Sequence, residues 1–134
     1  MTGWRIGYTA GPKNIIGAMS RIQSHSTSNP AVASQWASVE AIKGSQAPVA
    51  EMLAAFSERR RYMIERLNAM PGVSCVEPDG AFYAFPNISA FFGKESSSGS
   101  INNAVDFCEK LLKDKLVACV PGSGFGANDY IRLS

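Results

Sequence analysis

Apolar side chains recur at helical spacing in three stretches of the first half of the chain. Within each stretch they fall three and four residues apart, which places them on one face of an α-helix. The pattern predicts a helix over residues 13–23, a second from Pro30 to Gly44 and a long third over residues 48–67. Pro30 suits a first helical position, where a missing N–H costs nothing.

The second half of the chain has shorter apolar runs separated by turn residues. One helix is predicted over residues 101–116, and the Ser/Gly-rich stretch 87–100 is predicted to be a mobile loop that could act as a lid. Runs of strand length occur in this half and once near the start. The predicted strands are residues 4–9, 73–76, 81–85, 117–120 and 130–133.

This change of character places a domain boundary inside the long third helix. Residues 1–55 are predicted to belong to a larger domain, and residues 56–134 to form a small α+β unit.

Composition narrows the function classes. The chain has 134 residues with a net charge of +2, and its basic residues do not form the clustered surface typical of nucleic-acid binding. No apolar run is long enough to cross a bilayer. The three cysteines form no CxxC pair and accompany a single histidine, so we expect no metal site but reduced thiols in a cytoplasmic protein.

Two arginines are the candidate chemistry. Arg5 lies in Trp4-Arg5-Ile6-Gly7-Tyr8, and Arg132 lies in Tyr130-Ile131-Arg132-Leu133-Ser134. Arginine offers paired donors in a planar fork and keeps its charge, so it binds phosphate and carboxylate groups well. An arginine on a strand is most often structural, but two in apolar runs without an evident acidic partner indicate two anion sites.

The motifs around these arginines occur in a specific order. The chain resembles the class I, fold type I aminotransferases that depend on pyridoxal phosphate, and most closely the aspartate aminotransferase type. Any one motif is weak evidence, whereas all of them in order and at family-like spacing are strong. The matching segments are residues 1–8, 26–30 with 35–37, 78–86, 117–126 and 131–134.

The resemblance implies a C-terminal portion of the three-layer pyridoxal-phosphate fold. The chain would hold the end of the large α/β domain, a connecting helix and a small α+β domain truncated before its final helix. Arg5 would bind the cofactor phosphate and Arg132 the substrate α-carboxylate. The Schiff-base lysine would fall about four residues before Met1, so no catalytic residue is expected in this chain.

Two functions remain open at this point. The intact parent would be a dimeric transaminase that moves an amino group between an amino acid and a 2-oxo acid. Aspartate with 2-oxoglutarate is the leading pair, with prephenate, alanine and aromatic amino acids as alternatives. The chain alone would be inactive. The other possibility is a non-catalytic α+β binding or interaction module, from a truncated or degenerate paralogue.

Three further features have plainer interpretations. Tyr83 and Trp36 are expected to serve in packing. The glycines at 122, 124 and 126 are expected to make room for a turn near the site, because no strand–GxGxxG–helix order surrounds them.

Overall fold

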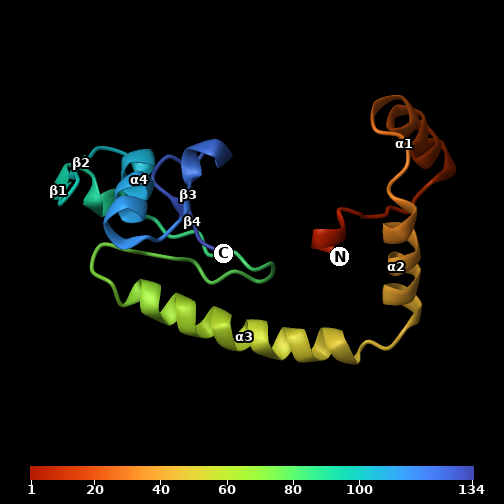
Figure 1. Cartoon of the computed structure of the whole chain (residues 1–134), viewed down its shortest axis with the longest axis horizontal. Helices are drawn as coiled ribbons and strands as arrows, with labels where there is room; N and C mark the ends of the chain where they lie inside the picture. Colours follow the sequence, from red (N-terminus) through yellow and green to blue (C-terminus); the bar gives the residue numbers. More distant parts are fainter. The chain divides into compact units, whose positions relative to one another are not determined.

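The computed structural model describes the backbone of residues 1–134 and every side chain except that of Thr2. The chain divides into two compact units, Met1–Ala50 and Glu51–Ser134 (Figure 1). The long helix α3, Ala47–Asn68, begins in the first unit and ends in the second. The predicted boundary at residues 55 and 56 also falls in this helix, but assigning the units to a large and a small domain stays a prediction.

The first unit is helical. A short 3₁₀ helix, η1 (Thr2–Trp4), precedes α1 (Lys13–Ser26) and α2 (Val32–Lys43). Both predicted α-helices are present, since their bonds are local and their apolar spacing suits a helix. The strand predicted over residues 4–9 is absent. A strand is stabilised by bonds to a neighbouring strand, and the described residues place none beside this segment.

The second unit combines helices with two small sheets. The helix α4 begins three residues later than predicted, because the side chain of Asn103 caps it by accepting hydrogen bonds from the N–H groups of Val105 and Asp106. The other elements after α3 are η2 (Ser89–Phe91), β1 (Lys94–Ser96), β2 (Gly99–Ile101), α4 (Ala104–Lys115), β3 (Val120–Pro121), η3 (Gly122–Phe125) and β4 (Ile131–Arg132).

Strand pairing in this unit is antiparallel and short. β1 pairs with β2, and β3 pairs with β4 with Val120 opposite Arg132. The strands predicted over residues 73–76 and 81–85 shrink to single bridges, Ser74 to Asn87 and Ala84 to Leu133. The two stretches do not pair with each other in a hairpin within the described structure. Instead residues 84–88 bond to residues 129–133, which are distant in sequence.

The mobile loop predicted over residues 87–100 is wrong. This stretch holds η2 and most of the β1–β2 hairpin. Gly99, with φ of +110°, and two hydroxyl contacts build the turn: Ser96 Oγ donates to the Gly99 carbonyl and accepts from the Ser98 N–H. Serine and glycine suggested flexibility, but they supply the bonds and the backbone freedom that a tight turn needs.

The apolar core of the second unit has two clusters. One lies at the end of α3 and contains Ile64, Leu67, Cys75 and Ala84. The other lies between α4 and β4 and contains Ile88, Ala104, Cys108 and Ile131. Leu133 is packed against both. Leu133, the residue after β4, therefore joins the two clusters, and Arg132 lies between Ile131 and Leu133 in the chain.

No helix within the described residues combines the length and the apolar character needed to cross a bilayer.

Candidate functional site

Arg132 is held in place by the fold of the second unit. Its strand β4 is bonded to β3 on one side, and Leu133 exchanges backbone bonds with Ala84 on the other. Alternation along a strand sends the side chains of Ile131 and Arg132 to opposite faces. Ile131 enters the core, where it is 3% exposed, while Arg132 stays half-buried.

Two aromatic rings enclose the guanidinium group of Arg132. Its Cζ lies 4.5 Å from the centroid of the Tyr83 ring and 5.0 Å from that of the Phe125 ring. Each contact of this kind contributes about 0.5–2 kcal/mol. Phe125 is supported in turn by Phe85, at 6.0 Å between centroids, and Phe85 stacks on Tyr130 at 5.2 Å. The rings limit the movement of the guanidinium without using its N–H donors.

At least one N–H donor of Arg132 has no hydrogen-bond acceptor among the described residues. Its Nε is buried without a hydrogen-bond partner, and no carboxylate among the described side chains lies within ion-pair distance of the group. A buried donor left unsatisfied costs about 1–3 kcal/mol. An anion in the plane of the fork would remove that cost, so the arrangement suits a planar carboxylate.

A turn built around glycine leads into β4. A Cβ added to Gly122 would lie 2.2 Å from the Ala127 carbonyl oxygen and 2.6 Å from that of Tyr130. The Gly122 N–H donates to the Tyr130 carbonyl at 2.7 Å. Gly126 follows with φ of +75°, while a Cβ on Gly124 would meet nothing within 4 Å. Two of the three glycines are thus required by the turn.

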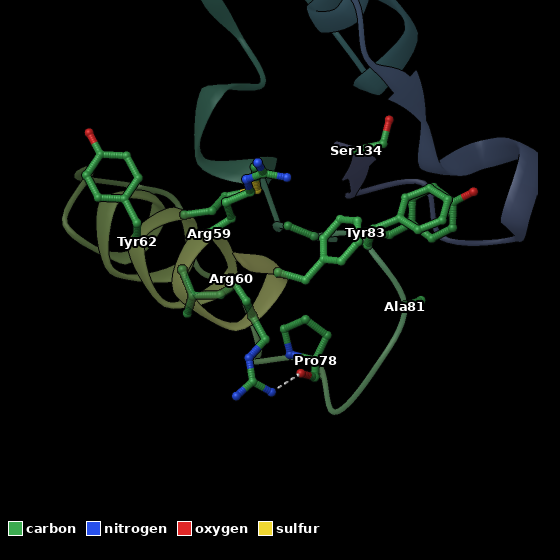
Figure 2. Close-up of a pocket in the computed structure, with 12 residues that line it drawn as sticks. Arg59, Arg60, Tyr62, Pro78, Ala81, Tyr83 and Ser134 are labelled. Carbon is green, nitrogen blue, oxygen red and sulfur yellow. Dashed lines mark hydrogen bonds between the residues drawn. The ribbon is translucent and has the colours of Figure 1, made fainter. Parts of the chain in front are cut away.

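Next to this arginine lies an apolar hollow of about 580 Å³ (Figure 2). It is bounded by α3, by the segment from Pro78 to Ala84 and by Ser134. Arg60 lies on its rim, where the guanidinium donates to the Pro78 carbonyl at 2.9 Å and pairs with Glu77 at 3.3 Å. Tyr83 both lines the hollow and contacts Arg132.

Arg5 belongs to the first unit. It is exposed, interacts within the protein, and has φ of +54°, in the left-handed region that non-glycine residues seldom adopt. Ser34, the one polar residue buried among those described, donates from Oγ to the Trp4 carbonyl at 3.0 Å. This bond ties the turn before Arg5 to α2.

The hollow beside Arg5 is lined by hydroxyl and amide groups together with apolar side chains such as Ile16 and Met19. Its volume is about 1040 Å³, and its lining includes Ser24, Thr27, Ser28 and Asn29. Hydroxyls, amides and a guanidinium are the donors that a phosphate group accepts. By the chemistry of its donors, this set fits the phosphate of pyridoxal phosphate. Backbone strain of the kind seen at Arg5 also clusters at functional sites.

The sequence identified the two arginines but not their surroundings. Tyr83 was assigned to packing, yet its ring faces the Arg132 guanidinium. Trp36 was also assigned to packing, but it is 71% exposed within the described structure. Phe125 and Ser34 were missed. The position of Phe125 within a glycine-rich turn could have indicated a role near Arg132. Nothing in the sequence around Ser34 indicates its bond to the Trp4 carbonyl.

No three side chains of His, Cys, Asp or Glu gather as metal ligands among the described residues.

Comparison with known proteins relates the chain to one family. The family model described as aminotransferase class I and II matches residues 1–134. An aspartate aminotransferase of Geobacillus stearothermophilus is 50% identical, and an aspartate/prephenate aminotransferase of Cereibacter sphaeroides is 46% identical. These alignments cover 100% of this chain but 33% and 34% of the relatives.

A solved structure agrees. The crystal structure of the aspartate aminotransferase from Rhizobium meliloti matches with a TM-score of 0.85 at 46% identity, over 100% of this chain and 34% of that one. The predicted α/β fold class is thereby confirmed. The chain spans about a third of the length of these relatives. The matched length does not tell which third, so the C-terminal placement and the lysine before Met1 stay predictions.

Proposed function

The chain belongs to the class I and II aminotransferase family, and from that premise we propose that its intact parent is a pyridoxal-phosphate-dependent transaminase. The parent would use aspartate and 2-oxoglutarate. The relatives named for aspartate favour this pair, and the one also named for prephenate keeps that substrate as an alternative. The chain would be the C-terminal portion, with the reacting lysine before Met1, and would be inactive alone.

One observation carries the proposal most directly. Arg132 lies between two aromatic rings, and its buried Nε has no hydrogen-bond acceptor among the described residues. An arginine whose role was purely structural would be expected to have a carboxylate or carbonyl partner, as Arg60 has. We assign Arg132 to the substrate α-carboxylate.

Each part of this site has a separate task. Tyr83 and Phe125 hold the guanidinium so that its fork is oriented before the substrate arrives, which lowers the cost of ordering it on binding. Gly122 lets the chain approach Tyr130 closely enough to set the path of β4. The carboxylate would then be fixed, and with it the position of the substrate's α-carbon.

Arg5 would bind the cofactor phosphate, supported by the hydroxyl and amide side chains of its hollow. When bound, pyridoxal phosphate supplies an electron sink for the bonds at the substrate's α-carbon. The contribution of this chain is to hold the phosphate with Arg5 and the carboxylate with Arg132.

The parent is also proposed to be a cytoplasmic homodimer. Exposed apolar side chains on α1 and α2, such as Ile22 at 70% and Trp36 at 71%, favour a homodimer or further burial in the parent. Three free cysteines suit the reducing conditions of the cytoplasm.

The test uses the full-length parent that contains these residues. Arg132→Lys should lower kcat/KM for aspartate about 30- to 1000-fold, the equivalent of about 2–4 kcal/mol for a charged contact that is lost, while cofactor absorbance persists. Arg5→Lys should instead lose cofactor on dialysis. Arg66→Lys, on the exposed face of α3, is the matched control and should change neither.

Near-normal kinetics in Arg132→Lys would refute the assignment of that residue. Loss of substrate binding with unchanged cofactor affinity in Arg5→Lys would exchange the two roles. A parent frame without a lysine shortly before Met1, together with no transaminase activity, would favour the non-catalytic binding module.

A further inference from the structure

Two cysteines from different elements meet in the second unit. Cys108 lies on α4 and Cys119 lies just before β3, and their Sγ atoms are 3.3 Å apart. Both are free thiols. The third cysteine, Cys75, belongs to the other core cluster.

The approach of these thiols follows from how α4 ends. Leu116 adopts the left-handed conformation, with φ of +58°, and its N–H bonds to the carbonyls of Leu111 and Leu112. The chain therefore reverses directly after the helix and brings Cys119 back beside Cys108. The pairing of Val120 with Arg132 then fixes the strand that follows.

The two thiols differ in their surroundings. Cys108 is 7% exposed and is packed with Ile88, Ala104 and Ile131, whereas Cys119 is half-buried. Burial, with the neighbouring Cys119 adding to it, raises the pKa of Cys108 to about 12. Cys108 therefore stays protonated at neutral pH, and Cys119 is the more exposed of the two cysteines.

We propose that Cys108 and Cys119 form an oxidation site that takes a peroxide and closes to an intramolecular disulfide. The Cys119 thiolate attacks one peroxide oxygen, the O–O bond breaks, and the other oxygen leaves as water after taking a proton. The Cys108 sulfur then attacks the resulting sulfenic acid, an S–S bond forms, and its thiol proton leaves with the hydroxyl as a second water. Peroxide is reduced and two thiols are oxidised, so the electrons balance.

The geometry favours closure over other products. A disulfide has its sulfurs about 2.05 Å apart, so closing the present 3.3 Å gap requires about 1 Å of movement, within reach of side-chain rotation. The contact places the Cys108 sulfur to attack the sulfenic acid as its thiol proton passes to the leaving hydroxyl. Cys75 has no such neighbour among the described residues: its Sγ lies 3.5 Å from the Val76 carbonyl oxygen.

The experiment treats the purified, reduced chain with one equivalent of hydrogen peroxide. Intact mass should fall by two hydrogen atoms, and accessible thiols after unfolding should drop from three to one. A peptide map should show Cys108 linked to Cys119 within one chain. Dithiothreitol should restore all the thiols. Cys75→Ser, the matched control, should form the link at the wild-type rate.

The single variants separate the two roles. Cys108→Ser should leave Cys119 to gain oxygen without forming a disulfide, and Cys119→Ser should slow peroxide consumption about tenfold, because the more exposed thiol is lost. Circular dichroism checks that both variants keep their helices; Cys108→Ala replaces the serine variant if that one unfolds. Links between chains, links to Cys75, or equal oxidation of all three cysteines would each overturn the proposal.

Discussion

The two units are both rich in apolar residues at regular spacing, but they use them differently. In the first unit α1 has no buried residue, and in α2 only Ser34 is buried among the described side chains. In the second unit, by contrast, buried apolar residues fill two clusters around α4, β4 and the end of α3. Amphipathic spacing therefore predicts that a helix forms, whereas burial requires a partner surface that only the second unit provides.

The end of α3 illustrates the difference. The side chain of Asn68 donates to the Cys75 carbonyl at 2.9 Å and accepts from the Cys75 N–H at 2.8 Å. It thus gives an isolated stretch of backbone the pair of bonds that a neighbouring strand would supply. The helices of the first unit have no comparable side-chain bond to a sheet-like segment among the described residues. We therefore expect the second unit to persist alone and the first to associate or unfold.

The largest expected effect tests burial directly. Ile88, 1% exposed, lies in the cluster beside α4, whereas Ile22 in α1 is 70% exposed. Ile88→Ala should lower the free energy of unfolding by about 2–5 kcal/mol through lost contacts and a cavity. Ile22→Ala should change it by less than about 0.5 kcal/mol. Urea unfolding followed by circular dichroism measures both, and equal effects would remove the contrast between the units.

The turn before Arg132 gives the next effect. Gly122→Ala places a methyl group against the carbonyl oxygens of Ala127 and Tyr130, so the backbone must shift, at a cost of about 1–3 kcal/mol. Gly124→Ala has open space and a smaller effect is expected. In the full-length parent, Gly122→Ala should also weaken substrate binding by moving Arg132. A normal Tm for Gly122→Ala would show that the close approach is not maintained in solution.

Helix capping gives a smaller effect. Asn103 caps α4 with two backbone bonds, while neither α1 nor α2 has a side-chain cap. Asn103→Ala should cost about 1 kcal/mol. Asn103→Asp keeps an acceptor at the same position and should restore most of the stability. Hydrogen exchange in the first turn of α4 reports the change, and equal protection in both variants would contradict the assigned cap.

The smallest effect is the acid dependence of the second unit. The Asn102 N–H and side-chain amide hold the pKa of Asp106 below its ordinary value, and the hydroxyls of Ser98 and Ser97 lower that of Asp114. A carboxyl whose pKa is lower when folded adds stability at pH values above its unfolded pKa, and that stability is lost as the pH falls through the folded pKa. The second unit should therefore lose stability below about pH 4.

The matching variants are Asp106→Asn and Asp114→Asn. Each should be slightly less stable than wild type at pH 7 and should approach it at an acidic pH below the lowered pKa values of the two carboxyls, where the wild type becomes protonated. Thermal unfolding at the two pH values measures the difference. A constant gap between variant and wild type would show that these bonds do not favour the ionised form.

The order of the elements was largely available from the sequence. All four α-helices were predicted, and the motifs around Arg5 and Arg132 indicated the aminotransferase family that the comparisons support. A helix is readable in this way because each of its bonds joins residues four positions apart, and caps such as Asn103 act within one turn. The two arginines could be recognised as candidate anion-binding residues because each is the one charged residue in a short apolar run.

The tertiary structure decided which segments meet. Residues 84–88 bond to residues 129–133, Tyr83 and Phe125 enclose Arg132 from two other segments, and Cys119 returns to Cys108. Each of these contacts joins residues that are far apart in the sequence. The local spacing of residue types does not identify such partners. Strand bonds, ring stacking on a cation and thiol pairs have no sequence period of their own, so their partners are fixed only when the core closes around Ile88 and Ile131.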